Sequence, residues 1–172
     1  YVYTARPDSI IDGRSVYEAR KEMGRRLARK SPAPGADLVA GMPDSGTIAA
    51  IGYAQAAKAP FEMAVVRNRY VGRTFIQPTQ KVRELGVKIK LNPIESLFRD
   101  KKAVIVDDSI VRGTTAERTV KMIRGCGAAE VHIRIASPPV LHPCLYGIDT
   151  RKKGTLAAVR MTREELCRKV GA

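Results

Sequence analysis

Residues 103–115, AVIVDDSIVRGTT, decide how this chain folds and where it can bind a ligand. The apolar run predicts a buried strand, two adjacent carboxylates follow it, and a helical pattern opens at Gly-Thr-Thr. Backbone N–H groups at a helix N-terminus bind phosphate, and carboxylates at a strand end can bind a diol or a metal. A ligand with a ribose diol beside a 5′-phosphate would engage both parts. The plainer interpretation is a βα turn with two solvated aspartates.

The same alternation of strand and helix extends along the chain. Apolar runs predict strands at 37–41, 61–66, 103–107 and 130–136, and helical spacing predicts helices at 15–30, 47–58, 92–99 and 114–124, with a last short helix starting at Thr162. Strands that alternate with helices form a parallel sheet covered on both faces, and ligands bind beyond the carboxyl ends of its strands. The sequence therefore predicts an α/β fold with a mostly parallel, twisted sheet. The turn at 43–46 and the acidic pair both follow strands, so both should lie on the ligand side.

Length and charge limit the possible functions. The 172 residues suffice for one domain, and the formal net charge of +14 favours anionic partners without choosing among nucleic acid, membrane and polyphosphate. Aromatic residues are only 5% of the chain and Trp is absent, so a base-stacking surface has little material. There is no apolar run long enough to cross a bilayer and no signal-peptide pattern. The first residue is Tyr1, so we expect a fragment or a processed product.

The cysteines and histidines do not form a recognisable metal or disulfide pattern. Cys126, Cys144 and Cys167 are an odd number at wide spacing, which indicates a reducing compartment, and we expect a cytoplasmic protein. His132 and His142 are the only histidines, and no HExxH motif is present. A zinc hydrolase is therefore not indicated.

Between residues 67 and 92 the periodic pattern is lost among basic and polar residues. Arg67, Arg69 and Arg73 cluster near its start, and Lys90 belongs to a further positive run near its end. Long connections in compact domains are often functional lids. A cationic loop that closes over a polyphosphate leaving group neutralises its charge and excludes water. A solvated basic loop is the plainer interpretation.

Several long motifs in one order resemble a known family. Residues 104–115 resemble the phosphoribosyl-pyrophosphate signature of type I phosphoribosyltransferases. The stretches at 3–9, 41–45, 68–78, 137–139 and 142–149 resemble, in the same order, the glutamine phosphoribosylpyrophosphate amidotransferases. The resemblance runs from residue 1 to about 150 and continues weakly to the end. It implies a type I phosphoribosyltransferase fold.

The resemblance also implies a role for individual residues. Asp107 and Asp108 match the pair that holds the ribose hydroxyls and, with magnesium, the substrate; Ser45 matches a magnesium-associated position. Arg67 departs from the family, which commonly has lysine there, and a guanidinium is not a simple substitute for an ammonium. The expected pyrophosphate loop is Pro43, Asp44, Ser45 and Gly46; the expected 5′-phosphate loop is Ser109, Ile110, Val111, Arg112, Gly113, Thr114 and Thr115; and the expected catalytic-loop residues are Arg67, Asn68, Arg69, Tyr70, Gly72, Arg73 and Lys90.

By resemblance, the implied cofactor is Mg²⁺. Cys144 matches a ligand of an iron–sulfur cluster in one branch of the family. Such clusters normally need four cysteines, and Cys126 and Cys167 do not match the other ligand positions. We therefore expect no cluster in this chain, and the match at Cys144 concerns a full-length parent.

The family consists of an N-terminal glutaminase that releases ammonia and a C-terminal half that transfers it to phosphoribosyl pyrophosphate. We expect residues 1–172 to be a single phosphoribosyltransferase domain, with the glutaminase domain upstream in the parent and a shortened C-terminus. The implied partners are phosphoribosyl pyrophosphate, ammonia, inhibitory purine nucleotides and further copies in a homo-oligomer. Neither a membrane nor nucleic acid is expected as a partner.

The predicted function is phosphoribosyl transfer to ammonia, which gives 5-phosphoribosylamine and pyrophosphate, the first step of de novo purine biosynthesis. Two alternatives stay open. One is a purine-base salvage phosphoribosyltransferase with the same signature. The other is a purine-sensing, nucleic-acid-binding regulator that retains the phosphoribosyl pyrophosphate site. The catalytic-loop residues and the absence of a separate DNA-binding module argue against the regulator.

Overall fold

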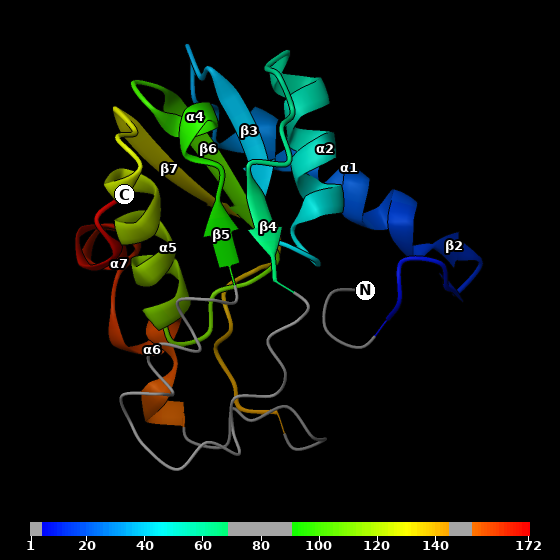
Figure 1. Ribbon diagram of the computed structural model, residues 1–172. Helices are drawn as coiled ribbons and strands as arrows, with labels where there is room; N and C mark the ends of the chain where they lie inside the picture. Colours follow the sequence, from blue (N-terminus) through cyan, green and yellow to red (C-terminus); the bar gives the residue numbers. More distant parts are fainter. Residues whose placement is uncertain (1–4, 69–90, 145–152) are drawn as a thin grey trace.

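A three-stranded parallel sheet forms the centre of the computed structural model, which describes residues 5–68, 91–144 and 153–172 (Figure 1). Its strands lie in the order β3 (Leu38–Gly41), β6 (Lys102–Asp107) and β7 (Glu130–Ile135). Val39 pairs with Val104 across the first two strands, and Val104 pairs with His132 across the second two. All three strands therefore present their carboxyl ends at one edge.

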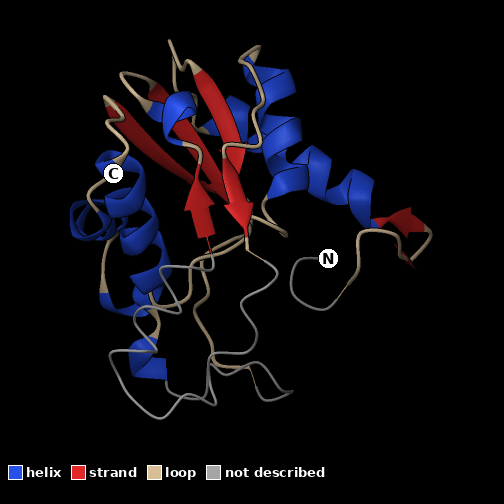
Figure 2. Ribbon diagram, in the orientation of Figure 1, coloured by secondary structure: helices blue, strands red, loops and turns tan. Residues whose placement is uncertain are grey.

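Helices cover both faces of this sheet (Figure 2). Successive side chains of a strand point to opposite faces, so Val39 and Val104 face α1 (Val16–Lys30) and α2 (Thr47–Ala57). Ile105 instead packs against α4 (Glu95–Phe98) and α5 (Thr114–Gly125). β6 is apolar on both faces because both are buried. The predicted α/β fold with a parallel sheet covered on both faces is confirmed.

Polar side chains set the ends of the predicted helices. The Ser15 hydroxyl accepts the Glu18 N–H at 3.4 Å and caps α1. At the other end of the chain, Thr162 and Glu165 form a reciprocal capping box at the start of α7 (Arg163–Val170). Both helices begin within one residue of the predicted position, because each has a cap residue before its first turn.

The strand predicted at 61–66 is only partly right. Phe61 forms a single parallel bridge to Val39, and the chain then leaves the central sheet. The next strand, β4 (Val65–Arg67), pairs antiparallel with β5 (Leu91–Pro93), which the sequence did not predict. Two strands this short, separated by residues 68–90, carry too little periodicity to be recognised. The hairpin of β1 (Ile10–Ile11) and β2 (Arg14–Ser15) was missed for the same reason.

The C-terminal segment returns to the start of α5. It contains a 3₁₀ turn, η2 (Lys153–Thr155), then α6 (Ala157–Arg160) and α7. The Arg124 guanidinium of α5 donates two hydrogen bonds to the Gly171 carbonyl, at 2.8 and 3.1 Å, and so ties the end of α7 to α5. Within the described residues, no helix is both long enough and apolar enough to span a bilayer.

Candidate phosphate-binding site

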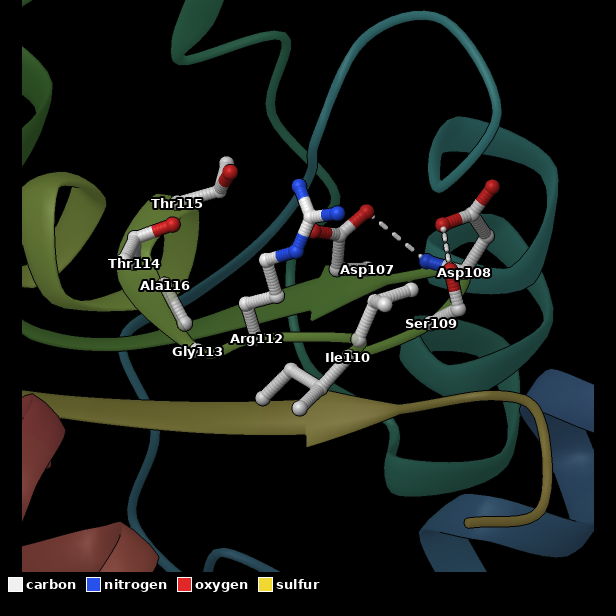
Figure 3. Close-up of a pocket in the computed structure, with 10 residues that line it drawn as sticks. Asp107, Asp108, Ser109, Ile110, Arg112, Gly113, Thr114, Thr115 and Ala116 are labelled. Atoms are coloured by element: carbon white, nitrogen blue, oxygen red, sulfur yellow. Dashed lines mark hydrogen bonds between the residues drawn. The ribbon is translucent and has the colours of Figure 1, made fainter. Parts of the chain in front are cut away.

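The candidate site is a cavity of about 350 Å³ at the carboxyl end of β6. One continuous segment, residues 107–116, lines it, running from the last residue of the strand into the first turn of α5 (Figure 3). The segment between them is a loop: β6 ends at Asp107, and α5 begins at Thr114, directly after Gly113 with its non-helical positive φ. The predicted ligand region is therefore one contiguous structure.

Hydrogen bonds within its own loop and from the segment after β7 hold the acidic pair. The Asp107 Oδ1 accepts the Asp108 N–H at 2.8 Å, and the Ser109 hydroxyl donates to Asp108 Oδ1 at 2.9 Å. The carbonyls of Asp107 and Asp108 accept N–H groups from Ala136 and Ser137, at 3.0 and 2.9 Å. Because those donors follow β7, the end of that strand fixes the backbone of the acidic pair.

The electrostatics of the pair favour a cationic ligand. Burial, and then the neighbouring charge of Asp108, raise the pKa of Asp107 to about 7. A positive charge beside the pair would offset both causes. Carboxylate oxygens are ligands that Mg²⁺ prefers, and Mg²⁺ is usually held by one or two carboxylates together with substrate phosphates. The described residues contain no group of three His, Cys, Asp or Glu side chains able to hold a metal. The acidic pair thus fits magnesium that is bound together with a polyphosphate.

The start of α5 has the features of an anion site. Gly113 caps the helix with φ of +82°, a conformation that favours glycine. The N–H groups of the first turn have no acceptor within the helix, and the positive end of the helix dipole lies there. Thr114 and Thr115 add exposed side chains with hydroxyls. The side chains of Asp107, Arg112 and Thr115 point to the same side of the loop (Figure 3). A phosphate can be bound at this turn.

A second loop, residues 43–46, follows β3 and lies against the end of β6. The Met42 N–H donates to the Val106 carbonyl at 2.9 Å, and the Gly46 N–H donates to the Met42 carbonyl at 2.9 Å. A Cβ on Gly46 would lie 2.5 Å from the Val106 oxygen, so only glycine permits this close approach. The exposed Asp44 accepts a hydrogen bond from Arg67 Nη1 at 2.9 Å. That contact brings the start of the basic segment to this loop.

The structure brings together most of the predicted site residues that it describes. Asp107 and Asp108 share one cavity with the predicted 5′-phosphate loop, and the 43–46 loop lies beside them. Arg67 ends β4 and contacts that loop, and Asn68 follows it. Cys144 is half-buried and not in a disulfide. Five of the predicted catalytic-loop residues lie outside the described residues: Arg69, Tyr70, Gly72, Arg73 and Lys90.

Sequence reasoning missed the C-terminal residues that contact the site. The Ala157 N–H donates to the Val111 carbonyl at 2.7 Å, and the Leu166 side chain lies against Gly113. Ser137 was noted only as part of a motif, although its N–H supports Asp108. The capping residues at 162 and 165 signalled the helix, but nothing in the sequence indicated where it would pack.

This chain has a parallel α/β sheet, with an acidic pair and the N-terminus of a helix at the end of one strand. That arrangement is typical of α/β proteins that bind phosphorylated ligands. Comparison with known families agrees with this class. Residues 18–137 match the model of the phosphoribosyl transferase domain, and the chain belongs to this family.

Known relatives match nearly the whole chain. It is 53% identical over 172 residues to the amidophosphoribosyltransferase of Bacillus subtilis, covering 100% of this chain and 36% of the relative. It is 55% identical over 165 residues to the amidophosphoribosyltransferase of Mycobacterium tuberculosis (strain H37Rv), covering 96% and 31%. A solved structure, the B. subtilis glutamine phosphoribosylpyrophosphate amidotransferase complexed with ADP and GMP, has a TM-score of 0.89 and 52% identity, covering 99% of this chain and 37% of that one. The chain thus spans about a third of these relatives, and the predicted type I phosphoribosyltransferase fold is confirmed.

Proposed function

We propose that this chain transfers the phosphoribosyl group of phosphoribosyl pyrophosphate to ammonia, giving 5-phosphoribosylamine and pyrophosphate. The observation that carries the proposal is the single cavity in which the acidic pair and a phosphate-binding helix start lie side by side. The loop at 43–46 lies next to it. Relatives with more than half of their aligned residues identical are amidophosphoribosyltransferases, which supports ammonia as the acceptor.

Each part of the site contacts a different group of the substrate. Asp107 and Asp108 accept hydrogen bonds from the ribose hydroxyls, and the first turn of α5 holds the 5′-phosphate. The loop at 43–46 holds the pyrophosphate, with Arg67 adding positive charge near it. When bound, magnesium held by the acidic pair and the diphosphate would neutralise charge on the leaving group. The ribose is thereby fixed at both ends, which orients C1 toward the acceptor.

The chemical step needs little from the protein beyond orientation and charge. The lone pair of neutral ammonia forms the C1–N bond as the bond from C1 to the pyrophosphate oxygen breaks, and the new ammonium group then loses a proton to solvent. Positive charge develops on the ribose ring, and the carboxylate pair is placed to stabilise it. No residue has to act as a covalent nucleophile.

Other parts of the proposal concern the parent protein and the residues outside the described ranges. We propose that Arg69, Tyr70, Gly72, Arg73 and Lys90 close over the leaving group together with Arg67 and Asn68. We further propose a single domain at 1–172, a glutaminase domain upstream in the parent, a homo-oligomer and a cytoplasmic location. Purine nucleotides are proposed as inhibitors; the B. subtilis structure is a complex with ADP and GMP.

The direct test follows pyrophosphate release from magnesium phosphoribosyl pyrophosphate with three acceptors. We expect turnover with ammonium chloride and none with glutamine or a free purine base. The rate at fixed total ammonium should rise with pH across neutrality, because only the neutral amine attacks. Turnover with a purine base but not with ammonia would overturn the proposal in favour of base salvage. No turnover, together with DNA binding that persists at physiological salt, would favour the regulator, since nonspecific attraction weakens steeply with salt.

A further inference from the structure

The C-terminal segment touches the predicted 5′-phosphate loop at two points, and neither residue belongs to the motifs that defined the site. The first contact is a hydrogen bond of 2.7 Å from the Ala157 N–H to the Val111 carbonyl. The second is apolar, because the Leu166 Cδ1 atom is 3.2 Å from the position that a Cβ on Gly113 would occupy. Both partners lie within the loop that lines the cavity.

These contacts act on the backbone atoms that would bind phosphate. A peptide unit is planar and trans, so its C=O and the next N–H point in opposite directions. Holding the Val111 carbonyl against α6 therefore fixes the orientation of the Arg112 N–H. Gly113 has a positive φ of +82°, and the Leu166 side chain fills the space beside its Cα. The geometry of the turn before α5 thus depends on a segment more than forty residues later in the chain.

The C-terminal segment is itself held in place at both ends. Ala157 is buried at the start of α6. The capping box, in which the Thr162 N–H donates to Glu165 Oε2 at 2.8 Å, stabilises the first turn of α7. The end of α7 is fixed by buried Val170 and by the two hydrogen bonds from Arg124 to the Gly171 carbonyl. A segment anchored in this way can hold the loop in one conformation.

We infer that Ala157 and Leu166 are positioning residues that hold the 5′-phosphate loop in its binding conformation. The inference rests on the proposed function, because it assigns the loop to the 5′-phosphate of the ribose. It implies that affinity for the 5′-phosphate depends on the C-terminal segment, whereas affinity for pyrophosphate does not.

The test compares Leu166→Ala with Cys167→Ala, a control on an exposed position of the same helix. Calorimetry is performed with two probes, ribose 5-phosphate and magnesium pyrophosphate. Leu166→Ala should weaken ribose 5-phosphate binding by about tenfold or more, because small displacements of positioning groups have large effects. It should change magnesium pyrophosphate binding by less than about twofold, and Leu166→Met should restore the affinity. Unchanged ribose 5-phosphate affinity, or an equal loss for both probes, would overturn the inference.

A second measurement separates failure of the inference from failure of the proposed function. Ala157→Pro removes the N–H that Val111 accepts, at the first helical position, where proline is tolerated. Hydrogen exchange of the amides at 109–115 is then compared in the ligand-free parent, Ala157→Pro, Leu166→Ala and Cys167→Ala proteins. We expect these amides to exchange faster in Ala157→Pro and Leu166→Ala than in the parent, and at the parent's rate in Cys167→Ala. Equal exchange in all four would overturn the inference even if the parent binds both probes. A parent that binds neither probe would overturn the proposed function, and exchange would still decide whether the segment holds the loop.

Discussion

The loops after β3 and β6 lie at the same edge of the sheet, yet they are built in different ways. The loop after β6 contains its acids, its hydroxyls and its helix start within one continuous stretch, residues 107–115. The loop after β3 depends on segments distant in sequence: it lies against the Val106 carbonyl, and Arg67 pairs with its Asp44. The first loop thus carries its functional side chains and its helix start in its own sequence, although distant segments hold its backbone, whereas the second gains its basic side chain, Arg67, only through the fold.

The largest predicted effect concerns the close contact of the β3 loop with β6. Gly46→Ala places a Cβ 2.5 Å from the Val106 carbonyl oxygen. That oxygen belongs to the backbone of the central strand β6, which cannot shift without disturbing the sheet. We expect the free energy of unfolding to fall by about 2 kcal/mol or more, measured by urea denaturation. Gly125→Ala is the control, because a Cβ at that position meets nothing within 4 Å. If Gly46→Ala is as stable as the parent, the two loops are not in contact as described.

A smaller effect on the stability of the fold is predicted at the acidic pair of the β6 loop. The pKa of Asp107 is raised to about 7 in the folded chain, above its ordinary value of 3.8, by burial and by Asp108. The folded state therefore binds the proton more tightly than the unfolded state, and stability falls as pH rises from about 4 through about 7. Asp107→Asn cannot ionise and retains an oxygen to accept the Asp108 N–H.

In the absence of ligand, Asp107→Asn should therefore melt at a higher temperature than the parent at pH 8, by at least about 2 °C. The difference should shrink at pH 5, where the parent carboxyl is mostly protonated. Thermal unfolding of the parent and the variant measures the difference in melting temperature at pH 8 and at pH 5. A variant with the same melting temperature as the parent at pH 8 would show that folding does not desolvate the Asp107 carboxylate, contrary to the raised pKa of this half-buried residue.

The smallest predicted effect on stability concerns the contact between Arg67 and Asp44. Both side chains are more than half exposed, so Arg67→Met should change the free energy of unfolding by less than about 1 kcal/mol. Its effect should appear in ligand binding, with magnesium pyrophosphate affinity lower by about threefold to tenfold. Arg6→Met, which breaks the exposed Arg6–Asp8 pair elsewhere, is the matched control and should leave that affinity unchanged. Equal magnesium pyrophosphate affinity in the two variants would show that Arg67 does not contribute to pyrophosphate binding.

The contrast between features encoded in adjacent residues and features formed by distant segments also explains which parts of the structure the sequence predicted. The β6 strand, the acidic pair and the start of α5 were identified because the evidence for each lies within a few adjacent residues. The antiparallel pair of β4 and β5 was not, because each strand has three residues and the partners are far apart in sequence.

The contacts of the C-terminal segment with Val111 and Gly113 were also missed. A backbone hydrogen bond between distant segments leaves no trace in residue type, since every residue except proline carries the same N–H. The capping box at Thr162 predicted that α7 exists, but the surface against which it packs is set by the tertiary fold.

The most direct test of the central claim is calorimetric titration of magnesium phosphoribosyl pyrophosphate into the parent chain and into the Asp107→Asn, Asp108→Asn double variant. The parent should bind with a dependence on magnesium, and the double variant should lose about a hundredfold or more in affinity while its circular dichroism stays unchanged. Undiminished affinity in a folded double variant would contradict the assignment of the acidic pair to the ribose and its magnesium.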